Sequence, residues 1–366
     1  MMKEKLNAWN VIKMAGAWIG FCVGSGFATG TALMQVYGSH GMMMFGILLV
    51  QILMDAYFAY SFIHLGFKGV CTNAMDIFEY YCGPYLGKAF KALTVVFLFL
   101  SPLCMVSGFG ATANQQWGWK PWIGAVIMAV VCLIVVLLGL KKLVDILGAA
   151  GPFIVILSLA IGGYGIFAHW DTLASGMAAS VGSDILKYNE SWLISGLLAD
   201  AWAPLILGPF LVVCCKTIKN EREGRLGSIL GAIGVAAAIS VMVLSYMAQF
   251  DGIKSAPIPT LYIVQSISPA LANVFMIFVF LGIFTSAVPS QFNLVDLFAK
   301  EGTKKYALVA TITILASCLA SFFIDFTVLF NKVYVFFSYA SWVFIACMIY
   351  TDVKEIMARK KNNAAA

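Results

Sequence analysis

Long apolar segments recur from one end of the chain to the other, separated by short polar stretches. Apolar runs of about 18 or more residues with few charges are typical of membrane-spanning helices. Their order predicts ten spans, at about residues 10–37, 40–66, 89–115, 121–139, 143–168, 191–214, 226–249, 270–297, 304–324 and 328–351. Because the polar stretches are short, we expect one all-α polytopic membrane domain over residues 1–366, with no separate water-soluble domain.

The first span carries four glycines in its middle, Gly20, Gly24, Gly26 and Gly30. Each glycine costs up to about 1 kcal/mol of helix stability relative to alanine. Non-helical backbone at membrane depth is tolerated only where it is buried in protein or lines a cavity. The cluster therefore indicates either a helix that breaks near Val23–Gly26 or close packing of helices through small residues.

The sixth span is also interrupted. Pro204 lacks a backbone donor and disturbs the preceding turn, and Gly208-Pro209 follows it. Asp200 lies just before them near mid-depth, where a carboxylate is costly unless it is paired. Proline in a membrane helix often means only a bend. The neighbouring aspartate favours a functional break near Ala201–Pro204.

The two interrupted spans are the first and the sixth of ten. Interrupted hydrophobic segments at corresponding positions of two halves are a pointer to the binding site of a transporter. The order of spans therefore predicts two five-helix repeats of opposite topology, at about 10–168 and 191–351, followed by a cytoplasmic tail at 352–366.

Composition and charge agree with a membrane protein. Hydrophobic residues make up 61% of the chain and charged residues 11%, whereas soluble domains have about a quarter charged residues. Lysine and arginine gather at both ends of the chain and in alternate loops, at residues 68–91, 141–142, 216–225 and 300–305. By the positive-inside rule, both termini are expected in the cytoplasm, with the protein in the cell membrane. Topology thus accounts for the net charge of +6, which gives no reason to expect nucleic-acid binding.

The residues that usually mark an enzyme are scattered. The nine cysteines form no CxxC pair, and the three histidines are far apart, without an HExxH pattern. No serine-elbow pattern accompanies them. We therefore expect no catalytic function.

Two short motifs resemble those of a known group of transporters. Span one contains Gly20-Phe-Cys-Val23-Gly24-Ser-Gly26, and span eight contains Gly282-Ile-Phe-Thr285-Ser286. In both, the chain resembles the amino acid–polyamine–cation superfamily, which has the LeuT-type 5+5 inverted repeat with helices 1 and 6 broken. Within that superfamily, it is similar to the small bacterial YkvI-like membrane proteins in length and in the GSGFATG stretch.

The resemblance implies one sodium site. Its ligands would be the carbonyl oxygens of Gly20, Val23 and Gly282 and the hydroxyl oxygens of Thr285 and Ser286. Oxygen ligands suit a hard cation, by the same logic as for calcium and magnesium. Adjacent threonine and serine in a membrane helix otherwise bond to their own helix or to a neighbouring one.

The chain also departs from relatives that couple to other ions. Phe27 stands where many two-sodium transporters have asparagine, so a second sodium is not expected. Some relatives couple to protons through a lysine in span five. Here residues 143–167 contain no lysine and only Asp145 as a charged residue, which favours sodium over a proton.

The residues around the two breaks would form the substrate site. Main-chain amides near Ser25 and Gly26 suit a carboxylate, and Asp200 suits an ammonium group. An aromatic face also attracts a cation. The full candidate set is Val23, Gly24, Ser25, Gly26, Phe27, Phe109, Asp200 and Trp202. A small amino acid or an organic amine would satisfy these groups, and the sequence does not choose between them.

The sequence thus predicts a sodium-coupled symporter that works by alternating access. A ligand sensor on the same scaffold, like the membrane subunits of germination receptors, and a proton-coupled transporter are the alternatives. Two further charges lie inside spans, Asp55 in span two and Lys332 in span ten. We expect Asp55 to pair with a hydroxyl or a helix end, and Lys332 to reach the outer interface or Asp325.

Overall fold

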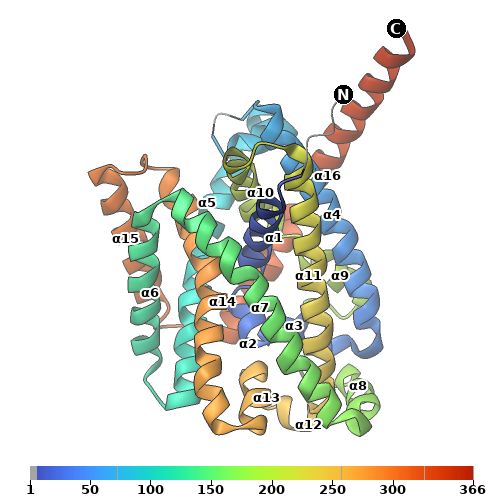
Figure 1. Ribbon diagram of the computed structural model, residues 1–366, viewed down its shortest axis with the longest axis vertical. Helices are drawn as coiled ribbons and strands as arrows, with labels where there is room; N and C mark the ends of the chain where they lie inside the picture. Colours follow the sequence, from blue (N-terminus) through green and yellow to red (C-terminus); the bar gives the residue numbers. More distant parts are fainter. Residues whose placement is uncertain (1–5, 72, 257, 325, 366) are drawn as a thin grey trace.

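The computed structural model describes residues 6–71, 73–256, 258–324 and 326–365, with the backbone alone for residues 140–151 and 359–365. Lys3, Lys5, Asp325 and the side chain of Asp145 lie outside the described residues. The described chain is helical (Figure 1). Its elements are α1 (Ala8–Cys22), α2 (Ser25–Thr29), α3 (Thr31–Val36), η1 (Gly38–Met43), α4 (Met44–Lys68), α5 (Asp76–Trp117), α6 (Pro121–Leu138), α7 (Leu140–Ala168), η2 (Trp170–Thr172), α8 (Leu173–Val181), α9 (Trp192–Ala199), α10 (Ala203–Cys214), η3 (Cys215–Thr217), α11 (Glu221–Ala248), α12 (Phe250–Ile253), α13 (Pro259–Ile267), α14 (Pro269–Asp296), α15 (Lys304–Ala320) and α16 (Phe326–Ala365).

Among the described residues, seven helical segments are long and apolar enough to cross a membrane. An eighth is formed if α7 from Pro152 is joined to Trp170–Val181 across a bend of 80°. The chain is therefore a multi-pass membrane protein. Helix α1 has 15 residues and α15 has 17, so each is short of the roughly 20 residues that cross a bilayer as one unbroken helix. The count of ten spans stays a prediction.

The first predicted span consists of three short helices in a row. Helix α1 begins at its N-cap residue Asn7, whose side chain accepts a hydrogen bond from the amide of Trp9. It ends at Cys22, and α2 begins at Ser25. Between α2 and α3 stands Gly30 with φ of 83°, a left-handed conformation that side chains other than glycine rarely adopt.

The sixth predicted span consists of α9 and α10. Asp200, Ala201 and Trp202 lie between them, and the amide of Ala203 donates to the carbonyl of Asp200 at 2.9 Å. Pro204 lies in the first turn of α10, where a missing N–H group costs no helical hydrogen bond. The proline therefore helps to start a helix here, and the three residues before it carry the interruption.

Helix α1 packs in the interior of the bundle, against α11 and α7 (Figure 1). Glycines on α11 make this contact close. A β-carbon on Gly227 would lie 2.5 Å from the carbonyl oxygen of Val11, and one on Gly231 would lie 2.8 Å from that of Ala15. Close packing through small residues is thus found on α11. It holds the broken helix in place from one side.

The start of α1 and the end of α16 lie at the same end of the bundle (Figure 1). There α16 is tied to α4. Asp352 accepts hydrogen bonds from Tyr57 at 2.9 Å and Ser61 at 2.7 Å, and Glu355 accepts one from Lys68 at 2.7 Å. These contacts hold α4 and α16 together at the end of the bundle where both termini lie.

Replacing Gly227 by alanine tests the contact between α1 and α11. The new methyl group would collide with backbone, which cannot turn away as a side chain can, so we expect a loss of about 1–3 kcal/mol and a lower melting temperature. Thermal unfolding of the purified protein in detergent measures it. Gly163→Ala in α7 is the control, because a β-carbon there meets nothing within 4 Å. Equal melting temperatures for the two variants would contradict the close packing.

Candidate functional site

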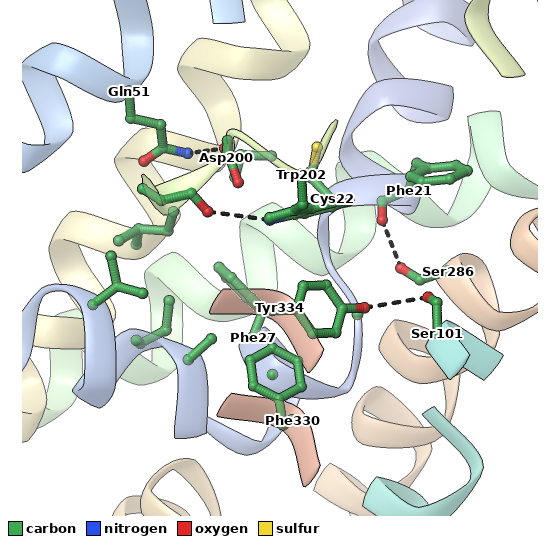
Figure 2. Close-up of a pocket in the computed structure, with 18 of the residues that line it drawn as sticks. Phe21, Cys22, Phe27, Gln51, Ser101, Asp200, Trp202, Ser286, Phe330 and Tyr334 are labelled. Atoms are coloured by element: carbon green, nitrogen blue, oxygen red, sulfur yellow. Dashed lines mark hydrogen bonds between the residues drawn. The ribbon is translucent and has the colours of Figure 1, made fainter. Parts of the chain in front are cut away.

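A cavity of about 60 Å³ lies between the two interrupted helices (Figure 2). Its wall is formed by α1 to α3, α4, α5, the segment between α9 and α10, α11, α14 and α16. Among the residues in the wall are Cys22, Gly24, Gly26, Phe27, Tyr37, Gln51, Ser101, Met105, Tyr188, Asp200, Trp202, Ser286, Ser290, Phe330 and Tyr334. The volume is enough for a few water molecules or a small ligand group.

The end of α1 releases two carbonyl groups. In a continuous helix, the carbonyls of Gly20 and Phe21 would accept from the amides of Gly24 and Ser25. Instead, the Gly24 amide donates to the Cys22 carbonyl at 3.0 Å, and the Ser25 amide donates to the Met105 sulfur at 3.2 Å. The local backbone geometry therefore leaves two buried acceptors that need a donor from elsewhere.

Helix α14 supplies that donor. The Ser286 hydroxyl lies 2.9 Å from the carbonyl oxygen of Gly20. It lies 2.8 Å from the carbonyl oxygen of Phe21, a contact that Figure 2 shows. The hydroxyl has one hydrogen, so the two carbonyls share it. Because an unsatisfied buried carbonyl costs about 1–3 kcal/mol, this contact stabilises the helix end.

The other candidate sodium ligands lie at the same contact. A β-carbon on Gly282 would lie 3.9 Å from the carbonyl oxygen of Val23, so the backbones of α1 and α14 approach closely there. The Thr285 hydroxyl donates to the carbonyl of Gly282 at 3.1 Å, within its own helix. The structure thus brings carbonyl and hydroxyl oxygens of both helices together. An all-oxygen set of this kind fits a hard monovalent cation.

Asp200 carries the acidic charge in the wall of the cavity. Its carboxylate accepts a hydrogen bond from the Gln51 side-chain amide at 2.6 Å (Figure 2). The oxygen of the same amide accepts one from the Tyr37 hydroxyl at 2.6 Å. This chain from α3 through α4 fixes the orientation of the carboxylate.

Aromatic rings cover the wall next to Asp200. The Trp202 indole donates to the carbonyl of Ala199 at 3.1 Å, and its ring meets the edge of Tyr334 at a centroid distance of 5.3 Å. Tyr334 stacks on Phe330 at 4.3 Å, and its hydroxyl lies 3.2 Å from that of Ser101 (Figure 2). The cavity therefore combines one carboxylate with the faces and edges of aromatic rings.

The structure places the candidate substrate residues in two groups. Gly24, Gly26, Phe27, Asp200 and Trp202 line the cavity.

Val23, Ser25 and Phe109 do not line it. Phe109 instead meets the edge of Phe280 at 5.4 Å, because this face of α5 packs against α14. Ser25 is buried, and its hydroxyl has no hydrogen-bond partner within the described part of the chain. Phe109 therefore does not line this cavity, and its place in the substrate site stays a prediction.

Sequence reasoning did not identify Tyr37, Gln51, Ser101, Phe330 and Tyr334, which also line the cavity. Gln51 offered a signal, since a glutamine within an apolar span one helical turn before Asp55 needs a polar partner. The aromatic residues offered none, because the chain contains 28 phenylalanines and 14 tyrosines.

The structure also shows where the two other charged residues predicted inside spans lie, Asp55 and Lys332. Asp55 is 1% exposed, and neither of its oxygens has a hydrogen-bond partner among the described residues. The expected pairing of Asp55 with a hydroxyl or a helix end is therefore wrong. Lys332 is exposed, and its other expected partner, Asp325, lies outside the described residues.

Hydrogen bonds join α3, the segment before α9 and α16 next to the cavity. Tyr188, in the segment before α9, lies in its wall, and its amide donates to the carbonyl of Gln35 at 3.4 Å. The Gln35 side chain accepts a hydrogen bond from the side-chain amide of Asn331 of α16 at 3.1 Å.

Within the described residues, no group of three or more histidine, cysteine, aspartate or glutamate side chains is arranged to hold a metal ion.

One curated relative matches nearly the whole chain. It is a membrane protein of Bacillus subtilis (strain 168) named YkvI, described as uncharacterised, and it is 21% identical over 92% of this chain and 94% of its own length. This similarity confirms the resemblance to YkvI-like proteins. No known family profile matches the chain.

Solved structures show the same fold. MhsT in complex with L-phenylalanine has a TM-score of 0.63 at 16% identity, covering 85% of this chain and 78% of its own. A manganese transporter of Eremococcus coleocola has 0.60 at 15% identity, covering 92% and 78%. Mhp1, a nucleobase-cation-symport-1 family transporter, has 0.57 at 10% identity, covering 87% and 74%.

The predicted resemblance to LeuT-type transporters is thus confirmed as a fold. The similar proteins are described as transporters and membrane proteins, not as enzymes.

Ser286→Ala tests the hydrogen bonds at the end of α1. Without the hydroxyl, the carbonyls of Gly20 and Phe21 lose their donor, and we expect a loss of about 1–3 kcal/mol in sodium-free buffer. Thermal unfolding measures the loss. Ser290→Ala is the matched control, because Ser290 lies one turn further along α14 and its buried hydroxyl forms no hydrogen bond with the described residues. A control as unstable as Ser286→Ala would contradict this assignment.

Proposed function

We propose that this protein is a sodium-coupled secondary active transporter that carries a small organic amine or amino acid by alternating access. One observation carries the proposal. The ends of two interrupted helices meet at one cavity, with freed carbonyl oxygens on one wall and a buried carboxylate on the other. Such interruptions form the substrate and ion sites of transporters.

Sodium would bind between α1 and α14. The ligands would be the carbonyl oxygens of Gly20, Val23 and Gly282 and the hydroxyl oxygens of Thr285 and Ser286. The support is that Ser286 already contacts the Gly20 carbonyl, while Gly282 lies beside Val23. Ions of one positive charge suit this set, because it contains no carboxylate.

The substrate would place an ammonium group at Asp200. A charge-assisted hydrogen bond to the carboxylate is about twice as strong as a neutral one. The rings of Trp202 and Tyr334 add an attraction for a cation in desolvated surroundings. Since the charged residue of the cavity wall is acidic, an amine is favoured over an acid.

An amino acid remains the second candidate. Its carboxylate would need donors near Ser25, whose amide now points to the Met105 sulfur. A thioether is a weak acceptor, so a carboxylate would compete with it. The small cavity volume of about 60 Å³ favours a small substrate in either case.

The proposed architecture is ten spans in two inverted five-helix repeats, with both termini in the cytoplasm. The support is that α1 begins and α16 ends at the same end of the bundle (Figure 1). Alternating access would then open the contacts of Asp352 with Tyr57 and Ser61 on the cytoplasmic side. The contact of Gln35 with Asn331 would open on the other side.

Uptake into proteoliposomes separates this proposal from the alternatives. Sodium-driven accumulation of an amine is the expected result. Binding without accumulation would identify a ligand sensor. Accumulation driven by a pH gradient and indifferent to sodium would identify a proton-coupled transporter. A thermal-shift screen of amines and amino acids, with and without sodium, selects the compound to use, since ligand binding raises apparent stability.

The double variant Thr285→Ala, Ser286→Ala tests the sodium site. It removes both proposed hydroxyl ligands with little change in volume, so stabilisation by sodium should vanish while the folded protein remains. The measurement is the difference in melting temperature between sodium and potassium buffers. Ser290→Ala should respond to sodium like the parent. A normal response of the double variant would place the ion elsewhere.

Asp200→Asn tests the substrate site. The change keeps the shape and removes the charge, and loss of one partner of a desolvated ion pair costs about 2–5 kcal/mol, or at least thirtyfold in affinity. Isothermal titration with an amine from the screen measures it. Asp251→Asn is the control, because that side chain is 95% exposed in a surface ion pair with Lys254. Equal affinity of parent and Asp200→Asn would remove Asp200 from the site.

A further inference from the structure

Asp55 is a buried carboxylate without a partner. Its side chain is 1% exposed, and no described residue hydrogen-bonds to either oxygen. It lies one helical turn after Gln51, so both side chains lie on the same face of α4. An ionised carboxylate in such surroundings is costly unless it is paired.

The neighbour of Asp55 is a second carboxylate. Asp200 and Asp55 lie close enough to interact electrostatically. Gln51 relieves the repulsion only in part, because its amide nitrogen donates to Asp200 at 2.6 Å and interacts more weakly with Asp55. Two ionised carboxylates in contact at low dielectric repel strongly, and such a pair commonly holds one proton.

The groups that surround the pair bring no positive charge to it. Cys22 of α1 and Tyr37 at the end of α3 interact with both carboxylates, and Tyr188 interacts with Asp200. None of the ion pairs among the described residues includes Asp55 or Asp200. Other titratable groups on elements packed against α4 are His40 on η1, Cys214 on α10, Cys215 and Lys216 on η3, Asp352 and Glu355 on α16, and on α11 Tyr246 and the charged residues between Glu221 and Arg225.

We propose that Asp55 is a proton-binding residue, and that Asp55 and Asp200 together hold one proton, which resides on Asp55. Asp200 accepts a hydrogen bond from Gln51 and lines the cavity, and both features stabilise its ionised form. Asp55 has neither. A proton on Asp55 provides the donor that the pair otherwise lacks, and Asp200 is the adjacent acceptor.

The proton is also the cation that fits the available space. Asp55 is not among the residues that line the cavity, so no room for a metal ion or an ammonium group opens onto it. A shared proton needs no cavity volume. The pair then presents one negative charge to the cavity, which favours a substrate with a single positive charge. This consequence for the substrate rests on the proposed function, whereas the proton on Asp55 does not.

Infrared spectroscopy of the purified full-length chain in lipid and heavy water, without sodium or organic ligand, tests the proposal. At neutral pH the parent should show the carbonyl stretch of a protonated carboxylic acid in apolar surroundings, and Asp55→Asn should lack it. Asp200→Asn should keep the band and lose it at a lower pH than the parent, because one of two adjacent negative charges is gone. The exposed control Asp251→Asn should match the parent.

A band that is unchanged in Asp55→Asn overturns the proposal, as does a parent without the band. If Asp55→Asn does not fold, the parent and Asp200→Asn are each labelled with carbon-13 at the aspartate carboxyls. The band should then shift on labelling in both proteins. A band that does not shift, or that is absent from Asp200→Asn, overturns the assignment to Asp55. Because neither sodium nor substrate is present, failure of the proposed transport function would leave this readout intact.

Discussion

The structure depends on how the backbone groups at the end of α1 are satisfied. A bilayer offers no water to an open carbonyl or amide, so every such group inside the protein needs an internal partner. Ser286 of α14 serves the carbonyls of Gly20 and Phe21, and the Met105 sulfur of α5 accepts the Ser25 amide. The interruption therefore exists only because α5 and α14 pack against it. The same packing sets the position of the cavity.

The glycines of the first span act in both ways that their pattern allows, as breaks in the helix and as sites of close helix packing. Gly30 has a positive φ and separates α2 from α3. Gly24 and Gly26 make room, because β-carbons there would lie 2.7 Å from Met105 and 2.3 Å from Phe330. A break in the helix and close packing are thus two results of the same requirement, which is that other helices must reach the backbone at this depth.

The two walls of the cavity differ in charge. One wall offers only neutral oxygens, around Ser286, while the other carries Asp200 with Gln51 behind it. Aromatic rings such as Trp202 and Tyr334 line the same cavity as the carboxylate, and apolar rings lower the local dielectric. In such surroundings each hydrogen bond and each charge counts for more than in water. In the proposed function, a buried carboxylate with one fixed donor would therefore favour a cation.

Features that depend on local pattern and on the chemistry of the surrounding lipid could be predicted from the amino-acid sequence. Apolar length placed the spans, so the predicted 121–139 and 191–214 agree closely with α6 and with α9 and α10. Glycine and proline marked where helices stop, and Asp200 stood out because a charge is costly in lipid.

Tertiary structure alone decided which side chains meet. Ser286 contacts residues 265 and 266 positions away, and Gln51 reaches Asp200 across 149 positions. No local rule gives such pairs, since they follow from the rotation and tilt of packed helices. The same packing turned Phe109 toward Phe280 and left Asp55 without a partner. The pattern of polar residues along the chain thus identified the candidate groups. Helix packing determined which of them interact, because a buried polar group can bond only to the groups that neighbouring helices place next to it.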